Sequence, residues 1–293
     1  MRFLLTGDWH ITDSTPKNRI DNYPEALFNK INWILETADR YNATVLQPGD
    51  LFDSPKISFD LFVKVFNLLT ITPLNFIAVA GQHDLRYHTS IENSPIFALH
   101  QVSALHLLMG NSYCRHCTGA GWGEGIPKPT YNDDYPKILL THRMIVDDKL
   151  WAEQEGHTFA RNLLRKTEYD IIVSGDNHKF FIEEYKGKYL FNMGSLMRSN
   201  IGQIEHQPKV VIFNTNDKSY EVLDVPIESA EKVFRLEKVE KQKEADEKIK
   251  AFVEGLQEDR EIGLDFESNI LSAIVKNKVS ESIKRIILKA MEE

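Results

Sequence analysis

The sequence predicts a layered α/β fold in which helices pack on sheets. From residue 1 to about residue 180, short apolar runs alternate with longer segments of helical periodicity. Between residues 181 and 227 the pattern changes to two hairpins, and after Pro226 it becomes charge-dense and favours helix. Of the 293 residues, 42% are hydrophobic and 27% are charged, which is enough apolar sequence for a packed core.

The elements of the first part are expected in regular alternation. Short apolar runs predict strands, and apolar residues at intervals of three and four predict helices, the first of which has Pro24 in its first turn. The expected order is a strand at 3–7, a helix at 24–42, strands at 44–50 and 74–81 around a helix at 58–69, a strand at 137–143, a helix at 159–170 and a strand at 171–175. Such alternation is typical of helices packed on sheets.

The second part of the chain is expected to be richer in antiparallel strands and then in helices. One hairpin should turn at Lys186-Gly187 and another at Asn216-Asp217. We therefore divide the chain into a main domain at 1–200, a small β-rich segment at 201–230 that caps or completes it, and a C-terminal helical segment at 231–293. The last helix has an apolar stripe that must be buried, either against the body or against a partner.

Composition narrows the classes of function. No segment is long and apolar enough to span a bilayer, and Met1 leads into a core strand, so we expect a cytoplasmic protein without a membrane partner. The formal net charge of −8 argues mildly against nucleic acid, although a local basic patch can still bind phosphates. Cys114 and Cys117 are interpreted as ordinary thiols, since a zinc site needs a second ligand pair.

Polar residues follow five of the apolar runs at the point where each strand should end. These residues are Asp8 and His10, then Asp50 and Asp53, then Gln82, His83 and Asp84, then His142, and finally Asp176, Asn177 and His178. Strand ends of α/β folds converge on one edge, and buried carboxylates are costly unless paired or bound to metal. Mixed carboxylate, imidazole and amide donors suit manganese, iron or zinc, and their number suits two ions that share a bridging carboxylate.

The order of these motifs resembles that of the calcineurin-like metallophosphoesterases. The matching motifs are D-x-H, GD-x-x-D, G-x-HD, a strand-end TH and G-x-x-H. The stretches DWH, GDLFD and NMGSLMRSN resemble more specifically the SbcD nuclease subunits, bacterial and phage partners of the SbcC ATPase. The resemblance covers about residues 1–225. It implies a two-sheet β-sandwich flanked by helices, which corrects a purely parallel arrangement.

The resemblance also implies a role for each residue. The first ion would be held by Asp8, His10, Asp50 and His178, and the second by the bridging Asp50 with Gln82, His142 and Asp176. His83 would stabilise or protonate the leaving group, and Asp84 would orient His83 through a hydrogen bond.

Two positions depart from the family pattern, and both belong to the second ion. Gln82 stands where the family has Asn, and Asp176 where it has His. The substitutions make the second site richer in oxygen, which favours Mn²⁺, with Mg²⁺ as an alternative, over zinc. A weak or empty second site in the free protein is the competing interpretation. Asp53 is assigned a supporting role.

The substrate is expected to be DNA. Cations near the motif loops could contact phosphates, and those proposed are Arg143, Lys179, Arg198, Arg86 and Lys56. The GSLMRSN loop could approach the substrate closely through Gly194 and Ser195.

The leading hypothesis is a metal-dependent DNA nuclease subunit of an SbcCD-like repair or recombination complex. The family implies docking of the C-terminal helices on a coiled-coil ATPase, and homodimerisation, for which 61–69 and 90–108 are candidate surfaces. The alternatives are a phosphodiesterase or phosphatase for small substrates and a catalytically weak scaffold.

Overall fold

The computed structural model describes residues 1–71, 75–110, 112–114, 116–129, 135–147, 158–235 and 284. The chain divides into two compact units, Met1–Ser229 and Ala230–Glu293. In the second unit, helix α5 spans Ala230–Val233, and most of the predicted helical tail lies outside the described residues. Within the described ranges, no helix has the length and apolar character that crossing a bilayer requires.

The first unit contains two six-stranded sheets. The first sheet has the order β14-β13-β1-β2-β3-β4, with β1 at Arg2–Leu5, β2 at Thr44–Gln47, β3 at Phe76–Ala78, β4 at His106–Leu107, β13 at Lys209–Asn214 and β14 at Tyr220–Asp224. Strands β1 to β4 are parallel, and β13 pairs with β1 in antiparallel fashion, with Phe3 opposite Phe213. The strands of the segment predicted to cap or complete the domain therefore extend the first sheet.

The second sheet has the order β11-β12-β10-β7-β6-β5. Its strands are β5 at Tyr113–Cys114, β6 at Cys117–Ala120, β7 at Ile138–His142, β10 at Ile171–Gly175, β11 at Phe181–Tyr185 and β12 at Lys188–Asn192. A separate parallel pair joins β8 (Ile145–Val146) and β9 (Thr158–Phe159). Both predicted hairpins are present, and Cys114 lies opposite Cys117 in a third hairpin.

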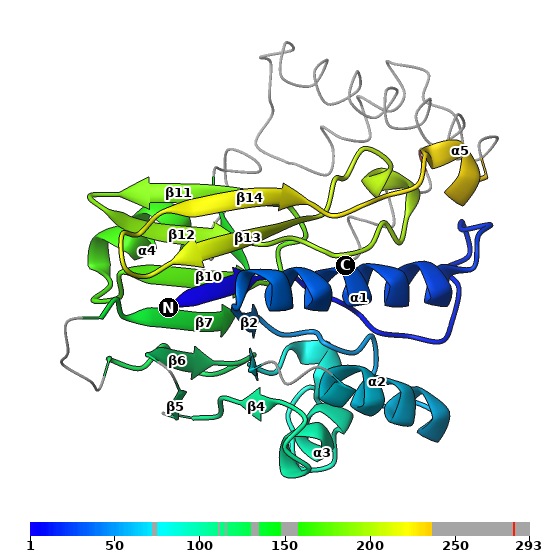
Figure 1. Cartoon of the computed structure of the whole chain (residues 1–293), viewed down its shortest axis with the longest axis horizontal. Helices are drawn as coiled ribbons and strands as arrows, with labels where there is room; N and C mark the ends of the chain where they lie inside the picture. Colours follow the sequence, from blue (N-terminus) through cyan, green and yellow to red (C-terminus); the bar gives the residue numbers. More distant parts are fainter. Residues whose placement is uncertain are drawn as a thin grey trace. The chain divides into compact units, whose positions relative to one another are not determined.

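Apolar side chains between the two sheets form the central core. Leu5, Leu46 and Ile77 of the first sheet cluster with Leu140 and Val173 of the second. Helices α1 (Tyr23–Tyr41), α2 (Phe59–Ile71) and α3 (Pro95–Gln101) share a second cluster with the first sheet, and α4 (Ala160–Lys166) shares a third with the second sheet. Figure 1 shows α1 running alongside β1 and β2. The two-sheet α/β fold flanked by helices is confirmed.

Helix α1 shows how local sequence sets the position of an element. The Asn22 side chain accepts a hydrogen bond from Glu25 N, and Pro24 occupies the first turn. At the other end, Asn42 adopts the left-handed conformation and its N–H bonds to carbonyls of the last turn. The buried face of the helix includes Leu27 and Ile31, which belong to the cluster with the first sheet.

A cluster of cations lies beneath the loop that follows β12. Lys30 Nζ donates to Leu196 O at 3.3 Å, and Arg19 Nη1 donates to Arg198 O at 2.5 Å. Burial, together with the charges of Arg198 and Arg19, lowers the pKa of Lys30 to about 7. The folded chain therefore loses the Lys30 proton near neutral pH, whereas an unfolded chain keeps it up to about pH 10.

This shift predicts a pH-dependent stability. Between about pH 7 and pH 10 the unfolded chain binds more protons at Lys30, so the free energy of unfolding should rise with pH through this residue. In Lys30→Met that rise, measured by urea unfolding at pH 6.5 and 9.5, should be smaller by roughly 3 kcal/mol. The exposed Lys166→Met serves as control and should behave as wild type. An unchanged pH dependence in Lys30→Met would contradict the assignment.

Candidate metal centre

The predicted ligands meet where the two sheets face each other. Asp8, Asp50 and Gln82 follow the parallel strands β1, β2 and β3 of the first sheet. His142 ends β7, and Asp176 follows the parallel neighbour β10 of the second sheet. Each sheet thus contributes one half of the cluster, and the interactions described below join the halves.

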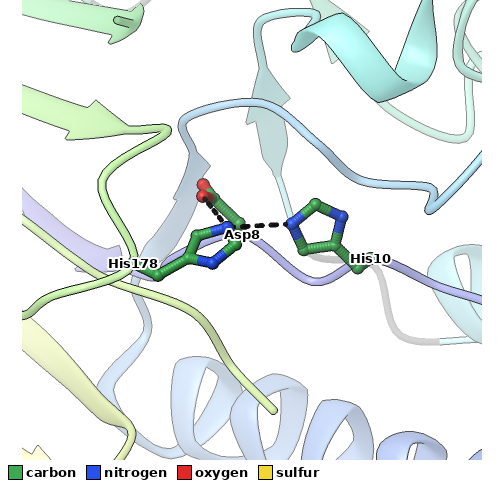
Figure 2. Close-up of side chains that lie close together, drawn as sticks. All are labelled: Asp8, His10 and His178. Atoms are coloured by element: carbon green, nitrogen blue, oxygen red, sulfur yellow. Dashed lines mark hydrogen bonds and ion pairs between the residues drawn. The ribbon is translucent and has the colours of Figure 1, made fainter. Parts of the chain in front are cut away.

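The first group consists of Asp8, His10 and His178. His178 Nε2 lies 3.6 Å from Asp8 Oδ2 and 3.3 Å from His10 Nε2. Figure 2 shows the His178 ring directing one nitrogen towards both neighbours. Their potential ligand atoms all lie within 4.8 Å of one another, a geometry in which one ion could contact all three.

The second group surrounds the buried His142 ring. His142 Nε2 lies 2.9 Å from Gln82 Oε1 and 3.3 Å from Asp50 Oδ2. Gln82 Nε2 donates to Asp176 Oδ1 at 3.2 Å, which brings Asp176 into the same cluster. His10 Nε2 lies 3.8 Å from Asp50 Oδ2, so Asp50 lies between the two groups, as expected of a bridging ligand. The structure brings together all seven residues predicted as ligands.

Burial and charge make this cluster suited to cations. Burial raises the pKa of Asp8 well above its ordinary value, although the charge of His142 opposes this. Burial also disfavours a charged His142, but the Asp50 carboxylate, whose Oδ2 lies 3.3 Å from His142 Nε2, outweighs that effect and raises the pKa of His142 to about 9. In the absence of a metal ion, the proton on His142 thus partly balances the two carboxylates.

Three buried polar atoms within the cluster have no hydrogen-bond partner. They are Asp8 Oδ1, Asp50 Oδ2 and His10 Nδ1. Buried polar atoms are normally satisfied, and buried charges are normally paired or coordinate metals. Carboxylate and imidazole atoms in this state fit divalent transition metals, so the residues present suit the ions that the sequence predicted.

The backbone is arranged to let these side chains approach one another. His10, Asp50 and Asp176 have φ values of 47°, 51° and 77°, which non-glycine residues seldom adopt. A Cβ atom at Gly81 would overlap Asp50 Oδ1, and one at Gly175 would overlap Asp8 Oδ1. Bringing the strand ends together thus requires strained backbone conformations at three ligands and glycine residues beside two of them.

His83 lies beside the cluster, but its predicted partner is wrong. Its ring Nδ1 lies 2.9 Å from the Asp53 carbonyl, and its backbone N–H donates to Asp50 Oδ1 at 2.9 Å. The Asp84 carboxylate instead accepts hydrogen bonds from the N–H groups of Leu51, Phe52 and Gly81. Asp84 is thus a structural residue that ties the loop after β3 to the loop after β2, and the Asp53 carbonyl orients His83.

The predicted DNA-contacting cations fall into different environments. Arg86 and Lys56 are exposed. Lys179 is exposed and pairs with Asp147 at 2.8 Å, and Arg143 Nη2 donates to Glu124 O at 2.9 Å.

Arg198 is not available for contact with DNA. It is 4% exposed and donates to the carbonyls of Ile204 and Glu228, so its role is structural. The Gly194-Ser195 loop also has a structural role. Gly194 O accepts a hydrogen bond from the backbone N–H of the candidate ligand Asp8, and Ser195 is buried.

Several residues that position or contact the candidate ligands were not predicted from the sequence. The Pro48 carbonyl lies 2.8 Å from His142 Nδ1, which fixes the direction of Nε2 towards the cluster. Asn192 Nδ2 donates to the carbonyls of Asn177 and Lys179 and so holds the last ligand loop. The ring of Trp122 lies 6.3 Å from that of His142. Only Trp122 left a signal, as a tryptophan between glycines in GWGEG.

Comparisons with known proteins identify the family of the chain. The profile described as calcineurin-like phosphoesterase matches residues 1–180. No curated protein matches the chain. A structure described as a novel archaeal phosphodiesterase is 18% identical, with 76% of this chain and 99% of the other covered and a TM-score of 0.42. The protein TT1561 of Thermus thermophilus is 16% identical, with 77% and 99% covered and a TM-score of 0.48.

The role of Asp84 leads to a prediction about stability. Asp84→Ala leaves three buried N–H groups without their acceptor, which should lower the free energy of unfolding by about 3 kcal/mol in urea titrations. His83→Ala is the matched control and should change stability by less than about 1 kcal/mol. Equal stability of the Asp84 variant and wild type would show that these hydrogen bonds do not hold the loops.

Proposed function

The chain belongs to the calcineurin-like phosphoesterase family, and within that family we propose that it is a manganese-dependent DNA nuclease that acts in the cytoplasm. The observation that carries the proposal is the convergence of seven carboxylate, imidazole and amide side chains, with buried ligand atoms that lack hydrogen-bond partners. Two of these atoms are carboxylate oxygens of Asp8 and Asp50. Hydrolysis of phosphoesters is the chemistry of the family, and DNA as substrate is the further step.

The residues of the site have two kinds of role in the proposed hydrolysis, namely metal binding and proton transfer. Divalent ions at such a site neutralise phosphate charge and lower the pKa of a water nucleophile. Asp8, His10, Asp50 and His178 would hold one ion, and Asp50, Gln82, His142 and Asp176 the other. His83, held at Nδ1 by the Asp53 carbonyl, presents its other nitrogen to stabilise or protonate the leaving oxygen.

DNA is supported by sequence and by exposed charge. The stretches DWH, GDLFD and NMGSLMRSN resemble SbcD nuclease subunits. Arg86 and Lys56 are exposed and follow closely after the candidate ligands Gln82 and Asp50, where they could contact phosphates of a polymer.

A phosphodiesterase acting on small substrates is the second candidate. Two of the five predicted cations are already engaged or covered: Lys179 pairs with Asp147, and Arg198 is buried. This leaves less positive charge for a long polyanion and favours a shorter substrate.

The assembly that we propose follows the same resemblance. The chain would form a homodimer, and its C-terminal helices would dock on an SbcC-like coiled-coil ATPase. Phe59, Val63 and Ile71 of α2 are exposed apolar side chains on or beside the predicted dimer surface at 61–69, which supports its role.

Manganese-dependent digestion of end-labelled duplex and single-stranded DNA tests the proposal. Wild type should cleave, and His83→Ala and Asp50→Asn should each reduce the rate at least about 100-fold. Asp39→Asn, an exposed carboxylate on α1, should leave the rate unchanged. Cleavage of cyclic nucleotides or bis(p-nitrophenyl) phosphate without cleavage of DNA would establish the second candidate instead. Cleavage of neither would support a scaffold.

The oxygen-rich second site predicts the metal preference. Asp176→His replaces a carboxylate near Gln82 with an imidazole and should shift the ratio of Zn²⁺ to Mn²⁺ affinity upwards by about tenfold or more. The ratio can be measured by competition between the two ions at fixed pH. An unchanged ratio would mean that Asp176 does not contact the ion.

A further inference from the structure

A pocket is lined in part by the loop after β6, which contains Trp122 and Glu124. It has a volume of about 320 Å³ and is lined mainly by Leu85, His88, Ile91, Met109, Trp122 and Glu124. His88 Nδ1 lies 2.9 Å from the carbonyl of the candidate ligand Gln82. The Trp122 ring lies 6.3 Å from that of the candidate ligand His142. Two residues of the pocket lining therefore lie next to ligands of the proposed second ion, His88 at the backbone of Gln82 and Trp122 near the ring of His142.

Trp122 is held in place by the backbone and yet remains accessible. Its backbone N–H donates to Ala80 O at 2.8 Å, just after the end of β3. The Glu124 carboxylate accepts from Gly121 N at 2.9 Å and from Gly110 N at 3.2 Å, and Arg143 Nη2 donates to Glu124 O. The loop is thus tied to its surroundings on both sides of the tryptophan. Despite this, Trp122 keeps 38% of its surface exposed, so packing does not explain its presence.

We propose that this pocket is a nucleobase subsite, in which the base next to the scissile phosphate stacks on Trp122. The inference rests on the proposed phosphodiesterase function and names the part of the substrate that is held there. A flat, preorganised aromatic side chain is the usual platform for bases of single-stranded nucleic acid. The pocket volume lies at the lower end of the range for small-molecule sites, and its apolar walls come with only a few polar groups.

The neighbouring charge fits the same substrate. Arg143 follows the candidate ligand His142 in the chain, and its guanidinium reaches the Glu124 carbonyl beside the pocket. A nucleotide with its phosphate at the metal centre would then meet a cation and an aromatic ring in sequence. Because stacking uses the face shared by all bases, the subsite should accept any base.

Cleavage of a matched pair of substrates tests the subsite. One oligonucleotide carries a normal base next to the scissile bond, and the other an abasic residue there. Trp122→Ala should raise KM for the first about tenfold and leave kcat and the abasic substrate unaffected. Trp122→Phe should restore most of the loss. Equal losses on both substrates, or no loss on either, would overturn the proposal.

A matched control and a binding measurement separate this inference from the proposed function. Tyr220→Ala removes an exposed aromatic side chain from β14. This strand forms one edge of the first sheet, whereas β3 and β4 lie at the other edge. Tyr220→Ala should leave KM unchanged. In the His83→Ala background, a 2-aminopurine oligonucleotide should lose fluorescence on binding, and the additional Trp122→Ala change should abolish that loss.

The two measurements also distinguish the possible failures. If wild type does not cleave DNA but hydrolyses thymidine 5′-(p-nitrophenyl phosphate), the DNA proposal fails, and the effect of Trp122→Ala on this substrate decides the subsite. Fluorescence quenching that persists without Trp122 would overturn the subsite even if DNA is cleaved normally.

Discussion

The burial of two carboxylates between two sheets is the constraint on which the rest of this structure depends. Asp8 and Asp50 are almost completely buried, and each has an oxygen atom without a hydrogen-bond partner. An uncompensated buried charge costs several kcal/mol, so the fold needs a cation or a proton at this place. In the absence of metal, His142 supplies a proton, because the nearby carboxylates, with Asp50 the strongest contributor, raise its pKa to about 9 despite its burial.

The architecture around this cluster follows from the need to bring its members together. Parallel pairing in each sheet places the ends of β1, β2 and β3 on one edge and those of β7 and β10 on another. The apolar core between the sheets aligns the two edges. Gly81 and Gly175 leave the space that the carboxylates fill, and the loops hold three ligands with positive φ. Function and local strain therefore occur at the same positions.

The residues around the cluster are those from which the proposed substrate site would be built. The Asp53 carbonyl fixes His83 at one side of the metal centre, while Trp122 and His88 form a pocket at another. Loops after β2, β3 and β6 provide these groups, and backbone N–H groups of all three loops are tied down by hydrogen bonds to the carboxylates of Asp84 and Glu124. A phosphodiester held between them would have its leaving group and its base in separate, preorganised environments.

The sequence by itself predicted the alternation of β1, α1, β2, α2, β3, β7, α4 and β10, the two later hairpins, and the seven candidate ligands, because these follow local patterns: periodicity, and polar residues directly after apolar runs. Only the tertiary structure decided which groups each side chain contacts and how deeply it is buried. Asp84 looked like the support of its neighbour His83, yet it reaches the backbone of Leu51 and Phe52, far away in the chain. Arg198 looked like a surface cation and is buried. Only the structure shows that the Trp122 ring lies near the candidate ligand His142. A side chain's direction and its distant neighbours are fixed by packing between sheets, which local sequence does not encode.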